Sequence, residues 1–167
     1  MVVAVHKGHH HFESISASKA DAGFGISSVF GDTWYVDSTN GVDASNTGKR
    51  AGDAFATIAK AISTGAAGDT VILSPGTHSV DVSSAALTPK ADMIFVAAVP
   101  PMGGAPSTII THDADDGADL MTIDVDGVVF SGIEFKLVAG GTTALQCVSV
   151  SQTTAVRGLV FIDCWFN

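Results

Sequence analysis

Residues 33–80 constrain the fold of this chain more than any other part of its sequence. They run from a short apolar segment through a loop rich in Gly, Asp and Asn to an amphipathic segment, and they close with a second apolar segment that stops at Pro75-Gly76. Short apolar runs bounded by turn residues are typical of β-strands. The stretch therefore predicts the order strand, loop, helix, strand.

The expected helix covers residues 54–64. Its apolar residues have the i, i+3, i+4, i+7 spacing of one narrow stripe: Phe55, Ile58, Ala59 and Ile62. Asp53 is the predicted N-cap and Gly65 the predicted stop. A single helix of this length is marginal in water, so we expect its stripe to cover an apolar surface elsewhere in the fold.

From residue 70 onward the sequence predicts short strands separated by turns, over 70–73, 93–99, 108–111, 120–125, 128–130, 133–137, 147–150 and 159–166.

An internal repeat connects several of these strands. Residues 127–135 align without gaps on residues 158–166, which places Val129 on Val160, Phe130 on Phe161 and Phe135 on Phe166. Residues 120–125 align on 145–150 in the same order. Such a repeat predicts stacked strands whose equivalent side chains form ladders along one core.

The region 33–80 resembles the entry into a right-handed parallel β-helix of the pectate-lyase-like superfamily. The resemblance implies an all-β solenoid with one short N-terminal capping α-helix, to which Phe55, Ile58 and Ile62 contribute. Asp53-Ala54 departs from the family, in which a Pro often precedes the Phe, and His78 stands where an aromatic residue is usual. The residues that carry the resemblance are Tyr35-Val36-Asp37, Gly41, Asp43, Phe55-Ala56-Thr57-Ile58, Ala61-Ile62, Gly68-Asp69-Thr70 and Pro75-Gly76-Thr77.

Three regions follow from this reading. Residues 1–32 are an extended N-terminal anchoring arm, residues 33–69 hold the entry strand, the loop and the capping helix, and residues 70–167 are the first turns of the parallel β-helix. An apolar strand ends at Phe166-Asn167 with no polar cap after it, so we expect the protein to continue past residue 167.

The arm is apolar but has no sustained period. We expect it to become ordered against other chains and to form an assembly interface. The alternative is a terminal segment packed on the flank of its own solenoid. The interface residues we expect are Phe12, Ile15, Phe24, Ile26, Val29 and Phe30.

Composition narrows the range of partners. Only 15% of residues are charged, which is low for a freely soluble monomer, and we expect part of the surface to be covered. A net charge of -9 with eight basic residues argues against nucleic acid and favours a neutral or cationic partner.

No segment is long and apolar enough to predict a membrane span, and residues 1–7 lack a signal-peptide pattern. Cys147 and Cys164 are predicted to be buried free thiols.

Two clusters invite a metal interpretation, and neither has the expected spacing. The first is His6, His9, His10 and His11, where adjacent imidazoles do not easily face one ion. We favour a contact segment that responds to pH there, with a metal site as the alternative. The second is the acidic run 112–119, followed by Asp124 and Asp126, which lacks the closing Glu of a calcium loop. We favour a solvated turn there, with weak calcium binding as the alternative. No metal ion or other cofactor is predicted.

No catalytic set emerges from the sequence. The resemblance points to lyases that use calcium carboxylates with a basic residue, and to hydrolases that use paired Asp residues. Arg50 and Arg157 lie outside any matching motif, and Asp115-Asp116 are adjacent, so on a strand they point to opposite faces.

The sequence therefore predicts a structural protein of a virus particle, namely a bacteriophage spike, fibre or capsid-decoration protein anchored by its arm at the virion surface. Expected partners are copies of itself, with a trimer implied by the resemblance, together with capsid or tail proteins and a host glycan bound by downstream turns. The alternative is an extracellular polysaccharide lyase or glycoside hydrolase of the β-helix superfamily whose active site lies beyond residue 167. A third hypothesis is a bacterial surface module.

Overall fold

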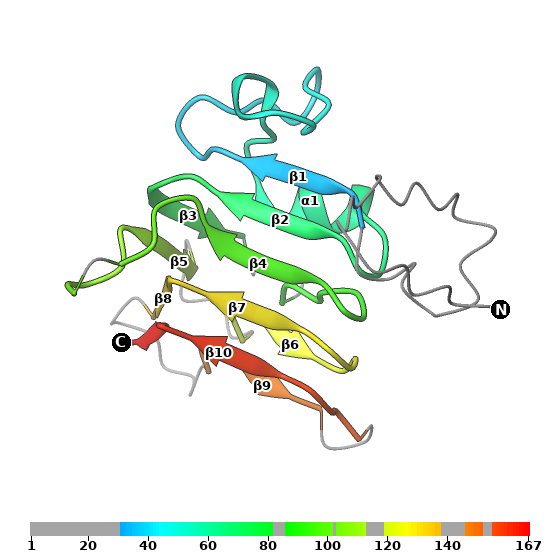
Figure 1. The fold of residues 1–167 in the computed structure, drawn as a ribbon, viewed down its shortest axis with the longest axis vertical. Helices are drawn as coiled ribbons and strands as arrows, with labels where there is room; N and C mark the ends of the chain where they lie inside the picture. The colour runs from blue at the N-terminus through cyan, green and yellow to red at the C-terminus, as the bar shows by residue number, and fades with distance from the viewer. Residues whose placement is uncertain (1–30, 82–85, 102, 113–118, 138–145, 152–154) are drawn as a thin grey trace, which may run out of the picture.

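The computed structural model describes residues 31–81, 86–101, 103–112, 119–137, 146–151 and 155–167. These residues form a strand-rich fold with one α-helix and one short 3-10 turn (Figure 1). The elements are β1 (Thr33–Val36), η2 (Ala51–Asp53), α1 (Ile58–Thr64), β2 (Thr70–Leu73), β3 (Gly76–Val80), β4 (Ile94–Ala97), β5 (Thr108–His112), β6 (Thr122–Ile123), β7 (Val129–Ser131), β8 (Ile133–Lys136), β9 (Ser149–Val150), β10 (Val160–Ile162) and β11 (Trp165–Phe166).

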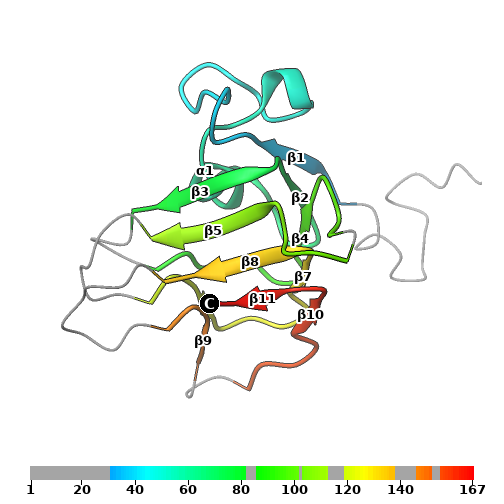
Figure 2. The same cartoon turned by 90° about the vertical axis from the view of Figure 1, so that its left-hand side faces the viewer.

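All pairs of neighbouring strands are parallel. A five-stranded sheet has the order β1-β2-β4-β7-β10, a four-stranded sheet the order β11-β8-β5-β3, and β6 pairs with β9. From β4 onward the chain enters the five-stranded sheet, the four-stranded sheet and the β6–β9 pair in turn, and then starts again. The five-stranded sheet faces the viewer in Figure 1 and the four-stranded sheet is seen in Figure 2.

The internal repeat gives the correct register for the 127–135 and 158–166 pair. Val160 lies beside Val129, Phe161 beside Phe130 and Phe166 beside Phe135, as the ungapped alignment predicts.

The second alignment is wrong by two residues. It placed Thr122 on Cys147, whereas the structure pairs Thr122 with Ser149 and Ile123 with Val150. A slip of two residues keeps the same side chains on the same face, so the apolar pattern does not reveal it.

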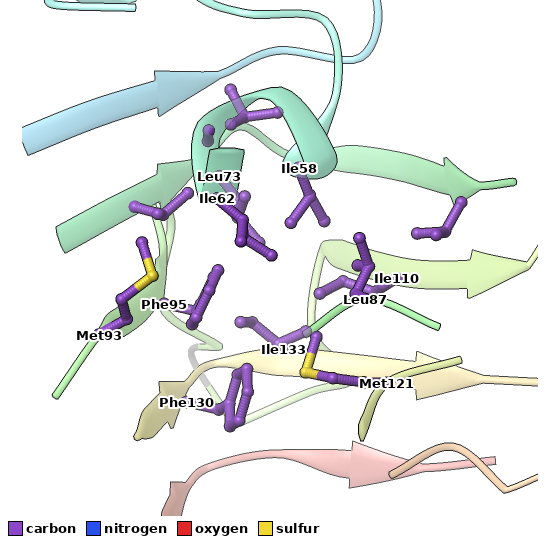
Figure 3. Packing of buried hydrophobic residues seen from close by; sticks show 14 of the residues in the cluster. Ile58, Ile62, Leu73, Leu87, Met93, Phe95, Ile110, Met121, Phe130 and Ile133 are labelled. Carbon is purple, nitrogen blue, oxygen red and sulfur yellow. The ribbon is translucent and has the colours of Figure 1, made fainter. Parts of the chain in front are cut away.

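The core lies between the sheets and consists of apolar ladders. Phe95 stacks on Phe130, which stacks on Phe161, with ring centroids 5.1 and 5.3 Å apart, and Phe135 meets Phe130 edge to face. Figure 3 shows Phe95 and Phe130 on neighbouring strands, pointing into the same interior. Stacked and edge-to-face pairs of this kind add about 0.5–1.5 kcal/mol each to the stabilisation from burial.

The helix covers one end of this core, with Ile58 and Ile62 pointing inward (Figure 3). The predicted stripe is correct in part. Ala59 of the predicted stripe is exposed. Ala61, which the stripe did not include, is buried on the inner face of the helix. Phe55 is buried but precedes the helix, and it makes a parallel bridge to Val36.

The predicted N-cap, Asp53, is also wrong. Thr57 is the N-cap, and its hydroxyl accepts a hydrogen bond from the Lys60 amide. The carboxylate of Asp43, in the preceding loop, fixes the start of the helix. It accepts hydrogen bonds from the amides of Ala56 and Thr57 at 2.7 and 3.1 Å and from the Thr57 hydroxyl at 2.6 Å. Asp53 instead accepts from Thr47. Gly65 ends the helix, as predicted.

Two further strand expectations need correction. The sequence did not predict β3, whose Gly, Thr, His and Ser residues give a weak strand signal. The expected strand 159–166 is two strands, β10 and β11, because Asp163 adopts a positive φ of 50° and turns the chain between the sheets.

Within the described ranges no helix is long and apolar enough to cross a membrane.

Candidate functional site

The outer face of the five-stranded sheet is the strongest candidate for a functional surface. Side chains alternate between the two faces of a strand, and the register aligns the outward positions of all five strands in two columns. These outward positions, called here the outer face, are Thr33, Tyr35, Thr70, Ile72, Ile94, Val96, Val129, Ser131, Val160 and Ile162.

None of these side chains is charged, although the chain has 17 acidic and eight basic residues. Three of the apolar ones are well exposed: Ile94 at 38%, Val160 at 40% and Ile162 at 48%. Contiguous exposed apolar surface on a folded domain marks an interaction site more often than a single exposed residue does. Figure 1 looks onto this face, with α1 and the remaining sheets behind it.

The four-stranded sheet differs on its outer side. The exposed Lys136 and the buried Glu134 of β8 occupy outward positions there, as do the exposed Thr77 and Ser79 of β3. The absence of charge is therefore a property of one sheet and does not follow from the fold itself.

A shallow hollow of about 110 Å³ lies at one end of the outer face. Three of its lining residues, Asp37, Ser74 and Ala98, directly follow β1, β2 and β4 and continue the outward alternation of those strands. The backbone amides of Ser74 and Ala98 donate hydrogen bonds to the carbonyl oxygens of Val36 and Leu73, and so extend the hydrogen-bond ladder of the sheet. The remaining lining is mostly apolar and consists of Tyr35, Val36, Ala51, Ala54 and Ile72.

Among the described residues that line this hollow, only Asp37 is charged. Its Oδ1 accepts the amides of Thr39 and Asn40 at 2.9 and 3.1 Å, and its Oδ2 accepts the Asn40 side-chain amide at 3.2 Å. Burial alone would raise the pKa of Asp37, but the Thr39 and Asn40 amides and the nearby Ser74 hydroxyl outweigh it, and the net pKa is lowered. Asp37 is therefore ionised at neutral pH.

Beside Asp37, two buried polar atoms have no hydrogen-bond partner within the described part of the chain: Ser74 Oγ and His78 Nδ1. The Ser74 hydroxyl is close enough to lower the Asp37 pKa, but its geometry does not make a hydrogen bond to that carboxylate. His78 Nε2 lies 2.8 Å from the Ser74 carbonyl oxygen, and burial lowers the pKa of this imidazole. An unpaired buried polar atom costs free energy, so each of them is a locally unfavourable position in the fold.

Other carboxylates have structural partners. Asp69 accepts the Trp34 indole at 2.7 Å and the amides of Asp32 and Ala66 at 2.8 and 2.7 Å. Lys49 lies over the Trp34 ring, 3.4 Å from its centroid, and pairs with Asp32 at 3.0 Å. These contacts hold the entry strand in place.

The β10–β11 end of the molecule is a second apolar surface. Phe166 is 54% exposed although its ladder neighbour Phe135 is buried, and Trp165 and Val150 are also exposed. Cys147 and Cys164 lie near this end and are half-buried, which corrects the prediction of buried thiols. Burial raises the pKa of both thiols and so disfavours the reactive thiolate.

Several predicted site residues lie outside the described residues. They include the whole predicted interface of the arm, the four histidines His6, His9, His10 and His11, and Asp113, Asp115 and Asp116. Two residues of the predicted acidic cluster are described. Asp119 accepts a hydrogen bond from the Gln146 amide and Asp126 accepts one from the Arg157 amide, so both carboxylates connect neighbouring loops. In the ranges that the structure covers, no three His, Cys, Asp or Glu side chains are grouped to hold a metal ion.

The sequence did not predict the outer face or the hollow. The signal was present as uncharged residues at alternate positions of each strand, but the strands combine into one surface only when their register is known.

No family model, curated protein or solved structure matches this chain.

Proposed function

We propose that this chain is a structural subunit of a virus particle, a spike, fibre or capsid-decoration protein, built on a right-handed parallel β-helix. The outer face is the observation that carries the proposal. An apolar surface without charge is costly to leave in water and inexpensive to bury against another protein.

The β-helix assignment is supported by the order of the strands. The chain enters the three groups of strands in a repeating sequence, all pairs are parallel, and aromatic residues stack from one strand to the next. Parallel strands linked by long connections are right-handed in nearly all known cases. Stacked turns of this kind bury one continuous core, which α1 covers at one end.

The dimensions of the outer face indicate that it does not act alone. Five strands spaced about 4.8 Å apart and about four residues long give a face of roughly 300 Å². Two such faces bury about 600 Å², which is half of the roughly 1,200 Å² at the lower end of stable interfaces. A second contact is required, and residues 1–32 are the proposed source, since their phenylalanines and isoleucines supply further apolar area.

In this proposal the partners are other copies of the chain, arranged as a trimer as the resemblance implies, and capsid or tail proteins at the virion surface. For host glycan binding, the described residues offer no proposed site.

The test is deletion of residues 1–32. We expect the truncated protein to keep its cooperative unfolding transition, because the described core lies within 33–167, and to lose incorporation into its particle. Incorporation is measured by mass spectrometry of purified particles, and folding by circular dichroism. Normal incorporation of the truncated chain, or its unfolding, would contradict the anchoring role. A β-helix enzyme would then be the better hypothesis.

A further inference from the structure

We propose that Asn40 and Gly41 form a site of spontaneous backbone modification that the fold keeps closed, and that Asp37 is the residue that closes it. The pair lies in the turn that follows β1, at the start of the loop that leads to α1. The inference is independent of the proposed function, because it concerns the covalent chemistry of the chain itself.

The sequence supplies the reacting groups. Of the three Asn residues in the chain, only Asn40 precedes a Gly. The backbone nitrogen that follows an Asn can attack the side-chain Cγ, and it does so most readily in Gly, which has no Cβ to obstruct the approach. Asn40 is exposed, so water also reaches this position.

The reaction proceeds in two steps. A bond forms between the Gly41 nitrogen and Asn40 Cγ while the bond from Cγ to Nδ2 breaks, and the proton of the Gly41 amide leaves with Nδ2 as ammonia. Water then opens the cyclic imide at either carbonyl group. The products at position 40 are aspartate and isoaspartate, and each adds one negative charge at neutral pH.

Asp37 holds the groups that must react. The Gly41 amide donates a hydrogen bond to the Asp37 carbonyl oxygen at 2.8 Å, so the proton that this nitrogen has to lose is engaged. The leaving nitrogen, Asn40 Nδ2, donates to Asp37 Oδ2 at 3.2 Å, and the Asn40 amide donates to Oδ1 at 3.1 Å. Ring closure requires Asn40 to change its backbone and side-chain torsions, and these three hydrogen bonds oppose that change.

Packing explains why a Gly stands beside the Asn. A Cβ at position 41 would collide with the carbonyl oxygens of Asp37 and Phe55. A larger residue, which would slow the reaction by obstructing the nitrogen, therefore does not fit there. Protection of Asn40 has to come from hydrogen bonds instead.

Modification would loosen the loop that covers the edge of the five-stranded sheet. β1 is the edge strand, and the loop lies beyond it (Figure 1). The Tyr35 amide donates to the Gly48 carbonyl oxygen at 2.8 Å and the Asp37 amide donates to the Phe55 carbonyl oxygen at 2.9 Å. Isoaspartate adds a carbon to the backbone at the start of this loop, and either product places a second carboxylate beside that of Asp37. Like charges at this distance repel each other.

The test follows the full chain during incubation at mildly alkaline pH, with the same chain in guanidinium chloride as the unfolded reference. Peptide mapping by tandem mass spectrometry measures conversion at each Asn. We expect Asn40 to convert at least about tenfold more slowly in the folded chain, since each hydrogen bond contributes about 1 kcal/mol and ring closure breaks several. Asn46, which precedes the β-branched Thr47, is the internal control and should convert far more slowly than Asn40 in the unfolded chain.

Three variants assign the protection to Asp37. Asp37→Ala removes both side-chain acceptors and should raise the rate at Asn40 in the folded chain at least about fivefold. Asp37→Ser keeps one oxygen for the turn and should give an intermediate rate. Asp53→Ala is the matched control, because it removes a carboxylate of the same loop that contacts Thr47, and should convert as the wild type does. Circular dichroism verifies that each variant is folded.

The inference is overturned if Asn40 converts equally fast in the folded and unfolded wild type, or if it does not convert in the unfolded chain. It is also overturned if folded Asp37 variants convert no faster than the wild type and Asp53→Ala. If Asp37→Ala does not fold, the rate in Asp37→Ser and the ratio between unfolded and folded wild type decide the result.

Discussion

The two faces of the five-stranded sheet are both uncharged and mostly apolar, but only the inner face is buried. On the inner side Val71, Leu73, Phe95 and Phe130 are almost fully covered, whereas Ile94 on the outer side, between Met93 and Phe95 in the chain, is 38% exposed. The inner side chains stabilise the fold through burial and aromatic stacking. The outer side chains have no comparable cover among the described residues, so the same chemistry is free to stabilise contact with another chain.

The largest effect on stability is expected from the centre of the inner face. Phe130→Ala should lower the free energy of unfolding by about 3–5 kcal/mol, because Phe130 is fully buried and contacts Phe95, Phe135 and Phe161. Ser131→Ala, one residue later and on the outer face, should change it by less than about 0.5 kcal/mol. Urea denaturation measures both. Similar losses would mean that the two faces are not energetically distinct.

A somewhat smaller effect is expected at Asp69, next to the inner face. Asp69→Ala should cost about 3 kcal/mol, since it leaves the Trp34 indole and the amides of Asp32 and Ala66 without their acceptor. Burial would raise the pKa of Asp69, but the Trp34, Ala66 and Asp32 hydrogen bonds and the Lys49 charge lower it overall.

The contribution from Asp69 is thus complete above the unfolded-state pKa of about 3.9 and is lost as pH falls through the folded-state value. Denaturation from pH 6 to 3 should show Asp69→Asn losing less stability than the wild type. Parallel pH profiles would contradict the role of the carboxylate.

A pH effect of smaller size is expected from His78. Its folded pKa is lowered by burial, so the unfolded chain takes up the proton first as pH falls through about 6.5. Stability is therefore present above that pH and declines below it until the folded pKa is reached. His78→Phe should flatten this part of the profile relative to the wild type, measured by thermal melts between pH 7.5 and 5. An unchanged slope would indicate that His78 is solvated.

The fold was predictable where strands repeat. Val129 and Val160 could be paired from the sequence because two aromatic positions, at 130 and 135, recur in the same spacing at 161 and 166. The pair at Thr122 and Ser149 was misaligned because a shift of two residues leaves the alternation intact.

The helix start shows a different limit. Asp53 and Thr57 both suit an N-cap, and the choice depends on Asp43, a loop residue 14 positions before Thr57 that the helical pattern does not include. The hollow was unpredictable for the same reason, since Asp37, Ser74 and Ala98 are far apart in the chain and become neighbours only through the parallel register.

A small effect on stability, and the most direct test of the central claim, is expected from placing a charge on the outer side of each sheet. Ile94→Lys lies on the central strand of the outer face, and Thr77→Lys is an exposed outward position of the four-stranded sheet. Each should change the free energy of unfolding by no more than about 1 kcal/mol, because both side chains can reach solvent. Sedimentation velocity of the full chain should then show an assembled wild type, an assembled Thr77→Lys variant and a dissociated Ile94→Lys variant. A monomeric wild type, or equal behaviour of the two variants, would contradict the claim that the uncharged outer face is the contact surface.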